Sequence, residues 1–142
     1  MSLSAFLGRK VVTVHPKDSL ASAAKLMDNE NVGAIVIVEK DRPVGIVTDR
    51  DLALATCVHG VSPDAHVQTV MTCPVSTIRE DEGVFTATRQ MMERAVRRLP
   101  VVDKLERLVG LISLDDLLLL FSRELQNVAE GVREEVGVQD VQ

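Results

Sequence analysis

The sequence predicts an α/β (α+β) chain of two β-α-β-β-α repeats, packed with pseudo-twofold symmetry and flanked by a short N-terminal and a longer C-terminal helix. Two observations carry this prediction. The motif at residues 45–52 (GIVTDRDL) is repeated in similar form at residues 110–117 (GLISLDDL). The preceding segments match at a shift of 64 positions, as Thr13 matches Thr77. Since neither half has enough apolar surface to close a core alone, we expect the halves to pack together.

The first repeat follows from hydrophobic period and turn chemistry. Apolar residues at helical spacing follow Asp18 or Ser19, either of which can serve as an N-cap. A run of β-branched residues then predicts a buried strand. The expected elements are a short N-terminal helix at 2–7, a strand at 11–14, a helix from 18 or 19 to about 29, strands at 34–38 and 44–47, and a helix from 48 to about 57.

The second repeat restarts the same pattern after a break at residues 60–64. The expected elements are a short helix near Ser62, a strand at 75–78, a helix over 84–91, strands at 99–102 and 108–112, and a helix from 113 to 125. The shift grows from 64 to 65 between Val102 and Gly110, which predicts one extra residue in the second hairpin turn. The expected domains are residues 8–60, residues 61–125 and a helical tail at 126–142.

Each repeat places a hydroxyl and a carboxylate three positions apart where its last helix opens, as Thr48 with Asp51 and Ser113 with Asp116. A hydroxyl at the N-cap accepts the N–H of N2 or N3, and a carboxylate in the first turn suits the helix dipole. Such capping boxes are common and are often only structural. Two copies after the same Gly-apolar-apolar strand end favour a further role.

Composition excludes several classes of function. The net charge of -5 and the 2% aromatic content argue against a nucleic-acid partner. No apolar run approaches the length of a membrane span, and the N-terminus lacks a secretory signal. Cys57 and Cys73 have no second pair, so no zinc or disulfide framework is suggested. We expect a soluble cytoplasmic protein with no membrane partner, no metal and no required cofactor.

The tandem repeat resembles the cystathionine-β-synthase (CBS) domain pair, also called a Bateman module. The resemblance covers about residues 11–121 and includes residues 31–38 (NVGAIVIV) and 97–103 (RRLPVVD), which look like the central strand of the family. Because little chain lies outside this span, we expect a stand-alone module. The resemblance implies two clefts between the repeats, which in many members bind AMP, ADP, ATP, S-adenosylmethionine or NAD. It also implies homodimers that form a flat disc through their helices, and regulation of a partner protein of unknown identity.

The Ser/Thr-x-x-Asp motif of the family maps onto Thr48 with Asp51 and Ser113 with Asp116. An ionised carboxylate only accepts hydrogen bonds and can accept from both hydroxyls of a ribose. We therefore expect Asp51 and Asp116 to bind the sugar of an adenosyl ligand. A ligand that contacts both repeats would favour one relative orientation of them and so signal to a partner.

Acidic residues at both helix starts oppose the binding of phosphate at those helix starts. Phosphate is therefore expected at Arg97 and Arg98, where the family often carries basic residues. Their matches in the first repeat, Gly33 and Ala34, are uncharged, so the cleft with Arg97 and Arg98 is expected to bind a phosphorylated ligand more tightly. A solvated arginine pair at a strand start is the alternative.

The adenine is expected, by family analogy, at the first strand of each repeat. The contacts would come from Thr13 and Val14 and from Thr77 and Ile78, although plain β-propensity explains the same residue types. Pro100 is expected either on a sheet edge or at a place where its missing N–H is not needed, and a ligand could approach the backbone at such an edge.

Two other functions compete with a ligand sensor. An enzyme is disfavoured because His15, His59 and His66 lie in or beside turns and lack metal-ligand spacing. A ligand-free interaction or dimerisation scaffold is favoured by an apolar stripe beyond the repeats: Leu125, Val128, Val132 and Val136. The stripe could fold back, seal a dimer, bind a partner helix or belong to a frayed tail.

Overall fold

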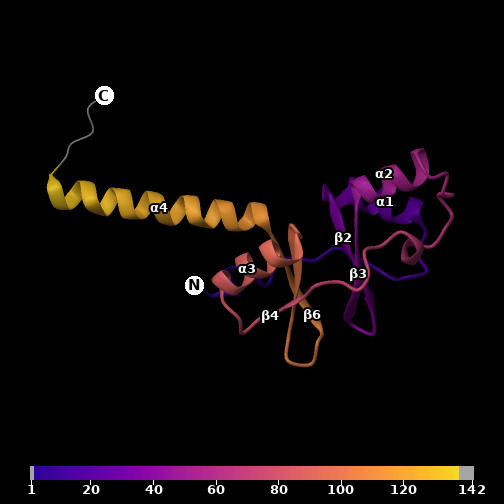
Figure 1. Cartoon of the computed structure of the whole chain (residues 1–142), viewed down its shortest axis with the longest axis horizontal. Coiled ribbons are helices and arrows are strands. Elements are labelled where there is room, and N and C mark those ends of the chain that lie inside the picture. The colour runs from indigo at the N-terminus through magenta and orange to yellow at the C-terminus, as the bar shows by residue number, and fades with distance from the viewer. Residues whose placement is uncertain (1, 138–142) are drawn as a thin grey trace.

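The computed structural model describes residues 2–137 and contains two three-stranded sheets, each with its own pair of helices (Figure 1). The first repeat comprises β1 (Thr13–Val14), α1 (Leu20–Glu30), β2 (Ala34–Glu39), β3 (Arg42–Thr48) and α2 (Asp49–Cys57). The second comprises β4 (Ile78–Arg79), α3 (Val84–Arg94), β5 (Arg98–Val102), β6 (Leu108–Ser113) and α4 (Leu114–Val136). Two 3-10 helices, η1 (Leu3–Phe6) and η2 (Val67–Thr69), precede the repeats. The predicted α/β fold with two β-α-β-β-α units is confirmed.

The two sheets share one topology. Their strand orders are β1-β2-β3 and β4-β5-β6, with a parallel first pair and an antiparallel second pair. Both hairpins shift register at the same place, between Ile37 and Val38 and between Val101 and Val102. The first hairpin turns through Lys40 and Asp41, both with positive φ, whereas the second turn is longer. The extra residue therefore lies in the second hairpin turn, as predicted.

Several predicted boundaries are wrong. The first strands are shorter than expected, since β1 begins only at Thr13 and β4 only at Ile78. The short helix expected near Ser62 is absent from the described residues around it, and η2 lies later, at Val67–Thr69. The last helix and the predicted helical tail form one continuous helix that ends at Val136 and not at Leu125, and residues 138–142 of the predicted tail lie outside the described residues.

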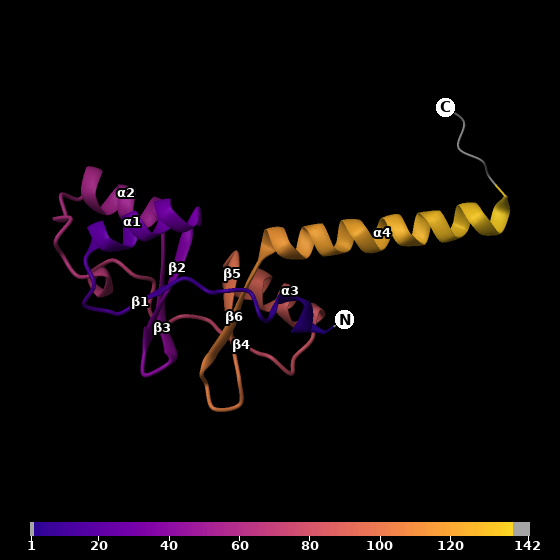
Figure 2. The ribbon, with the colours of Figure 1, turned by 180° about the vertical axis from the view of Figure 1, so that it is seen from behind.

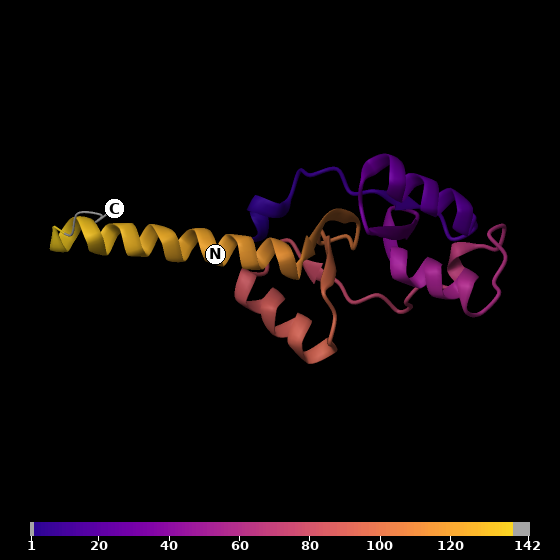
Figure 3. The ribbon, with the colours of Figure 1, turned by 90° about the horizontal axis from the view of Figure 1, so that it is seen from above.

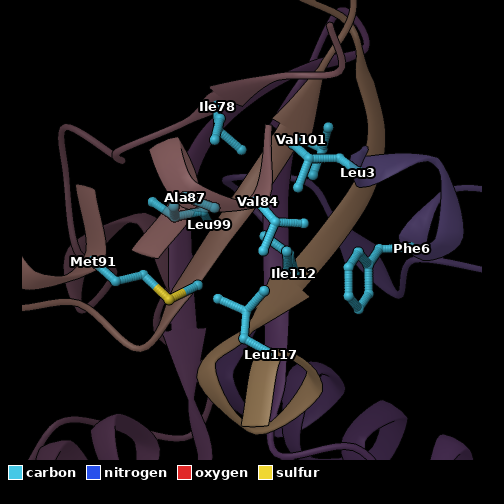
Figure 4. Packing of buried hydrophobic residues seen from close by; sticks show 10 residues of the cluster. All are labelled: Leu3, Phe6, Ile78, Val84, Ala87, Met91, Leu99, Val101, Ile112 and Leu117. Atoms are coloured by element: carbon cyan, nitrogen blue, oxygen red, sulfur yellow. The ribbon is translucent and has the colours of Figure 1, made fainter. Parts of the chain in front are cut away.

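Each repeat completes its core with the 3-10 helix that precedes the other repeat. Leu3 and Phe6 of η1 are buried among residues of the second repeat, with Leu3 drawn near Val101 and Phe6 near Ile112 and Leu117 (Figure 4). Val67 of η2, which matches Leu3 at the shift of 64, is buried in the core of the first repeat. Each core therefore contains residues from the segment that precedes the other repeat.

The same exchange explains the glycine that opens each repeated motif. Leu7 forms a β-bridge with Gly110, and Met71, its match in the second repeat, packs against Gly45. A β-carbon at Gly110 would lie 3.0 Å from Leu7 Cδ2, and one at Gly45 would lie 2.9 Å from Met71 Cγ. Both positions need glycine because a hydrophobic side chain of the crossing segment covers them.

Pro100 does not lie on a sheet edge, and of the two predicted settings it occupies the one in which its missing N–H is not needed. It is buried in β5, the central strand of its sheet, opposite Leu111 of β6. The neighbouring strand β4 begins opposite Val101, so it needs no N–H from Pro100. A proline is tolerated here because the ladder on that side starts one residue later.

The helices lie along one edge of the molecule and the hairpin turns along the opposite edge (Figures 1 and 2). Seen from above, α1 and α2 of the first repeat lie toward one end of the molecule and α3 and α4 of the second toward the other, with strands and connecting segments between them (Figure 3). The C-terminal half of α4 projects beyond the body in every view. Its apolar residues Leu125, Val128, Val132 and Val136 are all more than half exposed, so this stripe does not fold back onto the repeats.

Candidate functional site: two equivalent clefts

Both predicted capping boxes form. The Thr48 Oγ1 accepts the N–H of Asp51 at 3.1 Å, and Oδ2 of Asp51 accepts the N–H of Thr48 at 2.9 Å. The corresponding distances for Ser113 and Asp116 are 3.1 Å and 3.0 Å. Each aspartate thus uses one carboxylate oxygen on its own helix start, and only the other, Oδ1, remains for a ligand.

One cleft, which we call the Asp116 cleft, lies between the segment before β1, the start of β2, the start of β5 and the end of β6. It encloses about 290 Å³. Its lining residues are Arg9, Lys10, Val11, Val12, Val32, Gly33, Ala34, Arg98, Leu111, Ser113 and Asp116. Residues of both repeats contribute, so a ligand here would contact both halves.

A second cleft, the Thr48 cleft, encloses about 210 Å³. Its lining residues are Ile46, Thr48, Thr72, Pro74, Val75, Ser76, Val96, Arg97 and Arg98. Most of these match the lining of the Asp116 cleft at a shift of 64 or 65, as Val12 matches Ser76, Val32 matches Val96 and Thr48 matches Ser113. The duplication has therefore produced two crevices at matching positions of the two repeats.

The carboxylate of Asp116 faces its cleft beside positive charge. Arg9 donates a hydrogen bond from Nη1 to Oδ1 of Asp116 at 3.0 Å, while the Asp116 side chain stays 20% exposed. The Arg9 guanidinium also lies 5.9 Å from the centre of the Phe6 ring. Arg9, Lys10 and Arg98 together give this cleft three cations.

Arg9 and Lys10 were missed by sequence reasoning. They precede β1 in the chain, and only the exchange of η1 between repeats brings them to the helix start of the second repeat. One signal was available, since the shift of 64 pairs Lys10 with Pro74, next to the first strand of the other copy.

Asp51 is placed differently from Asp116. It is not among the residues that line the Thr48 cleft, and instead lines a neighbouring cavity with His59, Thr69 and Val70. Within residues 2–137, its Oδ1 has no recorded hydrogen-bond partner, whereas Oδ1 of Asp116 is bonded to Arg9. Of the two predicted sugar-binding carboxylates, Asp116 therefore lines a cleft, whereas Asp51 lines neither the Asp116 cleft nor the Thr48 cleft.

The predicted phosphate residues lie at the clefts. Arg98 lines both clefts, whereas Arg97 lines only the Thr48 cleft. Nη2 of Arg97 is 3.6 Å from Oδ1 of Asp115, and both side chains are well exposed. Since the Asp116 cleft carries Arg9 and Lys10 as well, positive charge is not confined to the cleft that contains Arg97.

The predicted adenine contacts fall one or two residues beyond the clefts. Val14 and Ile78 are buried in the two cores, and Thr77 is half-buried outside the lining of both clefts. Thr13 lines a different cavity of about 560 Å³, near the hairpin turns. The backbone that does border the clefts belongs to the residues just before: Val11 with Val12, and Val75 with Ser76.

Pro100 makes the two clefts chemically unequal. In the first repeat, the N–H of Val36 donates to the carbonyl of Val12 at 3.2 Å. The matching bond would join residue 100 to the carbonyl of Ser76, and proline has no N–H to donate. The Ser76 carbonyl of the Thr48 cleft is thus left as an acceptor, for example for the amino group of an adenine.

Other chemistries find no support in the described part of the chain. Residues 2–137 hold no group of three or more His, Cys, Asp or Glu side chains that could bind a metal ion. No helix within them is long and apolar enough to cross a membrane.

Comparison with known proteins identifies the class. The CBS domain family model matches twice, over residues 3–56 and 67–123, so the chain belongs to the CBS domain family and carries two tandem copies. The matched segments begin at η1 and at Val67 of η2, the elements that the two repeats exchange.

Curated relatives support the same family. An uncharacterised protein of Methanopyrus kandleri is 38% identical over 112 residues, which cover 78% of this chain and 57% of that protein. The chain thus spans little more than half the length of this relative. The CBS domain-containing protein YhcV of Bacillus subtilis is 38% identical over 108 residues, 76% of each chain.

Solved structures include a ligand complex. The CBS domain pair of protein MJ0100, crystallised with 5'-methylthioadenosine and S-adenosyl-L-methionine, has a TM-score of 0.77 and 29% identity, covering 87% of this chain and 98% of that one. The CBS-domain containing protein ATU1752 from Agrobacterium tumefaciens has a TM-score of 0.68 and 32% identity, covering 78% of this chain and 89% of that one.

Proposed function

We propose that this protein is a non-catalytic regulatory module that binds an adenosyl ligand in the clefts between its repeats. The observation that carries the proposal is the Asp116 cleft, where a partly exposed carboxylate at a helix start lies beside three cations. A carboxylate suits the two hydroxyls of a ribose, and cations suit a phosphate or a carboxylate. The MJ0100 domain pair, which binds S-adenosyl-L-methionine and 5'-methylthioadenosine, supports the same ligand class.

The Asp116 cleft is the stronger candidate for a phosphorylated ligand such as AMP, ADP, ATP or NAD. It offers sugar and phosphate contacts from one wall, through Asp116 and through Arg9 or Lys10. The Thr48 cleft lacks the carboxylate but offers the Ser76 carbonyl to an adenine amino group. It therefore suits an adenosyl ligand held mainly by its base, with Arg97 and Arg98 also in its lining.

The signal is a population shift between orientations of the two repeats. Both clefts are lined by residues of both repeats, so a bound ligand favours the orientation that contacts it best. Arg98 lines both clefts and can couple them. The readout is carried to a partner by the helical edge, where we also propose that two copies of the module associate.

Calorimetric titration tests the proposal. AMP, ATP, NAD, S-adenosylmethionine and 5'-methylthioadenosine are each titrated into the wild type, Asp116→Ala and Asp51→Ala. Loss of a charge-assisted hydrogen bond costs roughly 1.5 to 3 kcal/mol, so Asp116→Ala should weaken binding on the order of tenfold to a hundredfold.

Asp51→Ala is the matched control, because it removes an equivalent capping carboxylate that does not line a cleft. It should lower stability by about as much as Asp116→Ala and change ligand affinity far less. If none of the five compounds binds to the wild type at millimolar concentration, the sensor proposal fails. The ligand-free scaffold, which the exposed stripe on α4 favours, would then take its place.

A further inference from the structure

A cavity of about 560 Å³ lies between the two hairpins, outside both ligand clefts. Its lining comes from both hairpins and from the segment that leads into β1. The two hairpin turns reach the same edge of the molecule (Figure 2), and the N–H of Leu108 donates to the carbonyl oxygen of Asp41 at 2.8 Å. We call this space the hairpin cavity. Because it is built from both repeats, a molecule bound there would contact both of them.

The hairpin cavity adjoins the Asp116 cleft. Arg9 and Val11 line both spaces. The Arg9 side chain is 63% exposed and donates to Oδ1 of Asp116 at 3.0 Å, so its guanidinium lies where the two spaces meet. A ligand bound to Asp116 can therefore extend past Arg9 into the hairpin cavity without leaving the surface of the protein.

The hairpin cavity offers one unpaired carboxylate. Asp41 is exposed, and within residues 2–137 no group donates a hydrogen bond to its side chain or forms an ion pair with it. The Asp103 carboxylate, by contrast, already accepts hydrogen bonds from Leu105 and Arg107. The Arg107 side chain uses only Nε for this contact, so its two Nη groups remain as donors. The carboxylate of Asp41 and the guanidinium of Arg107 are thus available to a ligand.

These groups resemble the chemistry of the Asp116 cleft. In each space a carboxylate that can accept from the two hydroxyls of a ribose is accompanied by arginine. The walls of the hairpin cavity also include the half-buried Val11, Val38 and Val109, which suit the face of a base or of another flat ring. The hairpin cavity therefore has the apolar wall, the acceptor and the cation that a second nucleoside requires.

The length of β6 sets the spacing between the two carboxylates. Oδ2 of Asp116 accepts the N–H of Ser113, the last residue of β6, and the carbonyl of Asp41 accepts the N–H of Leu108, its first residue. These two N–H groups are separated by roughly 16 Å, the rise of a β-strand over that length. A mononucleotide held by Asp116 is too short to reach Asp41, whereas two nucleosides joined by a diphosphate can span this distance.

We propose that the hairpin cavity is a second nucleoside subsite and that the ligand of the Asp116 cleft is a dinucleotide of the chemical class of NAD. One nucleoside binds at Asp116, the diphosphate at Arg9, and the second nucleoside at Asp41 and Arg107. This inference rests on the proposed function, since it specifies the ligand of the cleft proposed there. A nucleoside triphosphate suits the same path less well, because its terminal phosphates would approach the carboxylates of Asp41 and Asp103.

The duplication does not repeat this arrangement at the Thr48 cleft. At the shift of 64, Arg9 matches Cys73, which carries no cation to hold a diphosphate. The lining of the Thr48 cleft also lacks a carboxylate for the first ribose. We therefore expect one dinucleotide to bind to each chain.

Titration calorimetry with NAD, ADP and ATP tests the inference. ADP carries the same adenosine and diphosphate as NAD and lacks the second nucleoside, so the ratio of their dissociation constants isolates the contribution of the hairpin cavity. We expect NAD to bind to the wild type on the order of tenfold more tightly than ADP, at one site per chain. ADP binding as tightly as NAD, or ATP binding more tightly than NAD, would overturn the inference and leave the proposed function standing.

Asp41→Asn removes the charge and keeps the turn, because asparagine also tolerates the positive φ of this position. The affinity for NAD should fall on the order of tenfold, and the affinity for ADP should stay within about twofold, which also shows that the Asp116 cleft is intact. Glu106→Gln is the matched control, since Glu106 has the same φ of 64° in the second hairpin turn and does not line the cavity. It should change neither affinity. Equal losses of NAD and ADP binding in Asp41→Asn would overturn the inference.

Val38→Phe tests the space itself. The larger side chain fills part of the hairpin cavity, and Val38 does not line the Asp116 cleft. Binding of NAD should weaken on the order of tenfold while ADP binding persists, and NAD binding unchanged in this variant would overturn the inference. If none of the three nucleotides binds to the wild type at millimolar concentration, the proposed function itself fails and this inference falls with it. That result differs from one in which ADP binds and the second nucleoside of NAD adds nothing.

Discussion

Arg9 lies 107 positions before Asp116 in the sequence, yet its Nη1 donates to Oδ1 of that carboxylate at 3.0 Å. The pair joins the segment that leaves η1 to the helix start of the second repeat. It also neutralises the one carboxylate oxygen that the capping box leaves for a ligand. Because the Arg9 side chain is 63% exposed, the guanidinium is free to turn toward a phosphate when a ribose takes its place.

The first prediction concerns this pair. Arg9→Met should weaken binding of AMP on the order of tenfold, because it removes a cation, and should change binding of adenosine much less, because Asp116 is released for the ribose. Titration of both compounds measures the ratio. The unfolding free energy should change by no more than about 1 kcal/mol, as expected for an exposed ion pair. Equal losses for AMP and adenosine would instead mean that Arg9 only positions Asp116.

Arg98 and Arg97 provide a matched pair of substitutions. Arg98 lines both clefts and Arg97 only the Thr48 cleft. In a two-site titration with AMP, Arg98→Ala should weaken both binding steps, whereas Arg97→Ala should weaken one and leave the other within about twofold. Each affected step should weaken by roughly tenfold to a hundredfold, the range for a charge-assisted contact. Identical isotherms for the two variants would show that the arginines act only through the overall charge.

Substitution of a glycine that opens a repeated motif should change the unfolding free energy in the opposite direction from substitution of a glycine in α4. Gly45→Ala brings a β-carbon into Met71, so we expect a loss of about 1 to 3 kcal/mol in the unfolding free energy from overpacking. Gly131→Ala meets open space inside a helix and should instead stabilise by roughly 0.5 to 1 kcal/mol. Urea unfolding followed by circular dichroism measures both. A Gly45→Ala protein as stable as the wild type would mean that Met71 does not hold its packed position.

The sequence predicts the repeated units well because their signals are local. Helix caps at Ser19, Thr48 and Ser113 and the alternation of strand and helix depend on residues a few positions apart, and these predictions are confirmed. The sequence could not decide between the two settings predicted for Pro100, because the choice depends on where β4 begins, and β4 has only two residues.

The exchange of 3-10 helices could not be predicted in this way. Leu3 and Phe6 pack on residues more than 70 positions away, and no local pattern reports such a contact. The same exchange carries Arg9 and Lys10 to the Asp116 cleft, so sequence reasoning assigned the positive charge mainly to Arg97 and Arg98. The repeat was sufficient to predict the helix starts at Thr48 and Ser113. It was insufficient to predict which residues of the other repeat line the clefts beside them.

The last prediction concerns Asp103, which closes the longer hairpin turn of the second repeat. Its Oδ1 accepts the N–H groups of Leu105 and Arg107, both at 2.9 Å, and its Oδ2 accepts Nε of Arg107 at 2.8 Å. Hydrogen bonding from the Arg107 backbone N–H, with further help from the Arg107 side chain and the Leu105 N–H, lowers the pKa of the Asp103 carboxyl despite its burial. The ionised form is therefore the one that stabilises the fold.

A lowered pKa in the folded state sets the sign of the pH dependence. The stabilisation from Asp103 is fully present above the ordinary pKa of an aspartate, about 3.9, and is lost as the pH falls through the lower folded value. Asp103→Asn should therefore reduce the thermal midpoint at pH 7, and the difference from the wild type should shrink as the pH falls below about 4. Thermal unfolding of both proteins from pH 7 to pH 3 measures this. Glu106→Gln, at an exposed acidic position in the same turn, is the control and should leave the pH profile unchanged. A constant difference between wild type and Asp103→Asn at every pH would show that the turn is held by geometry and not by the charge of Asp103.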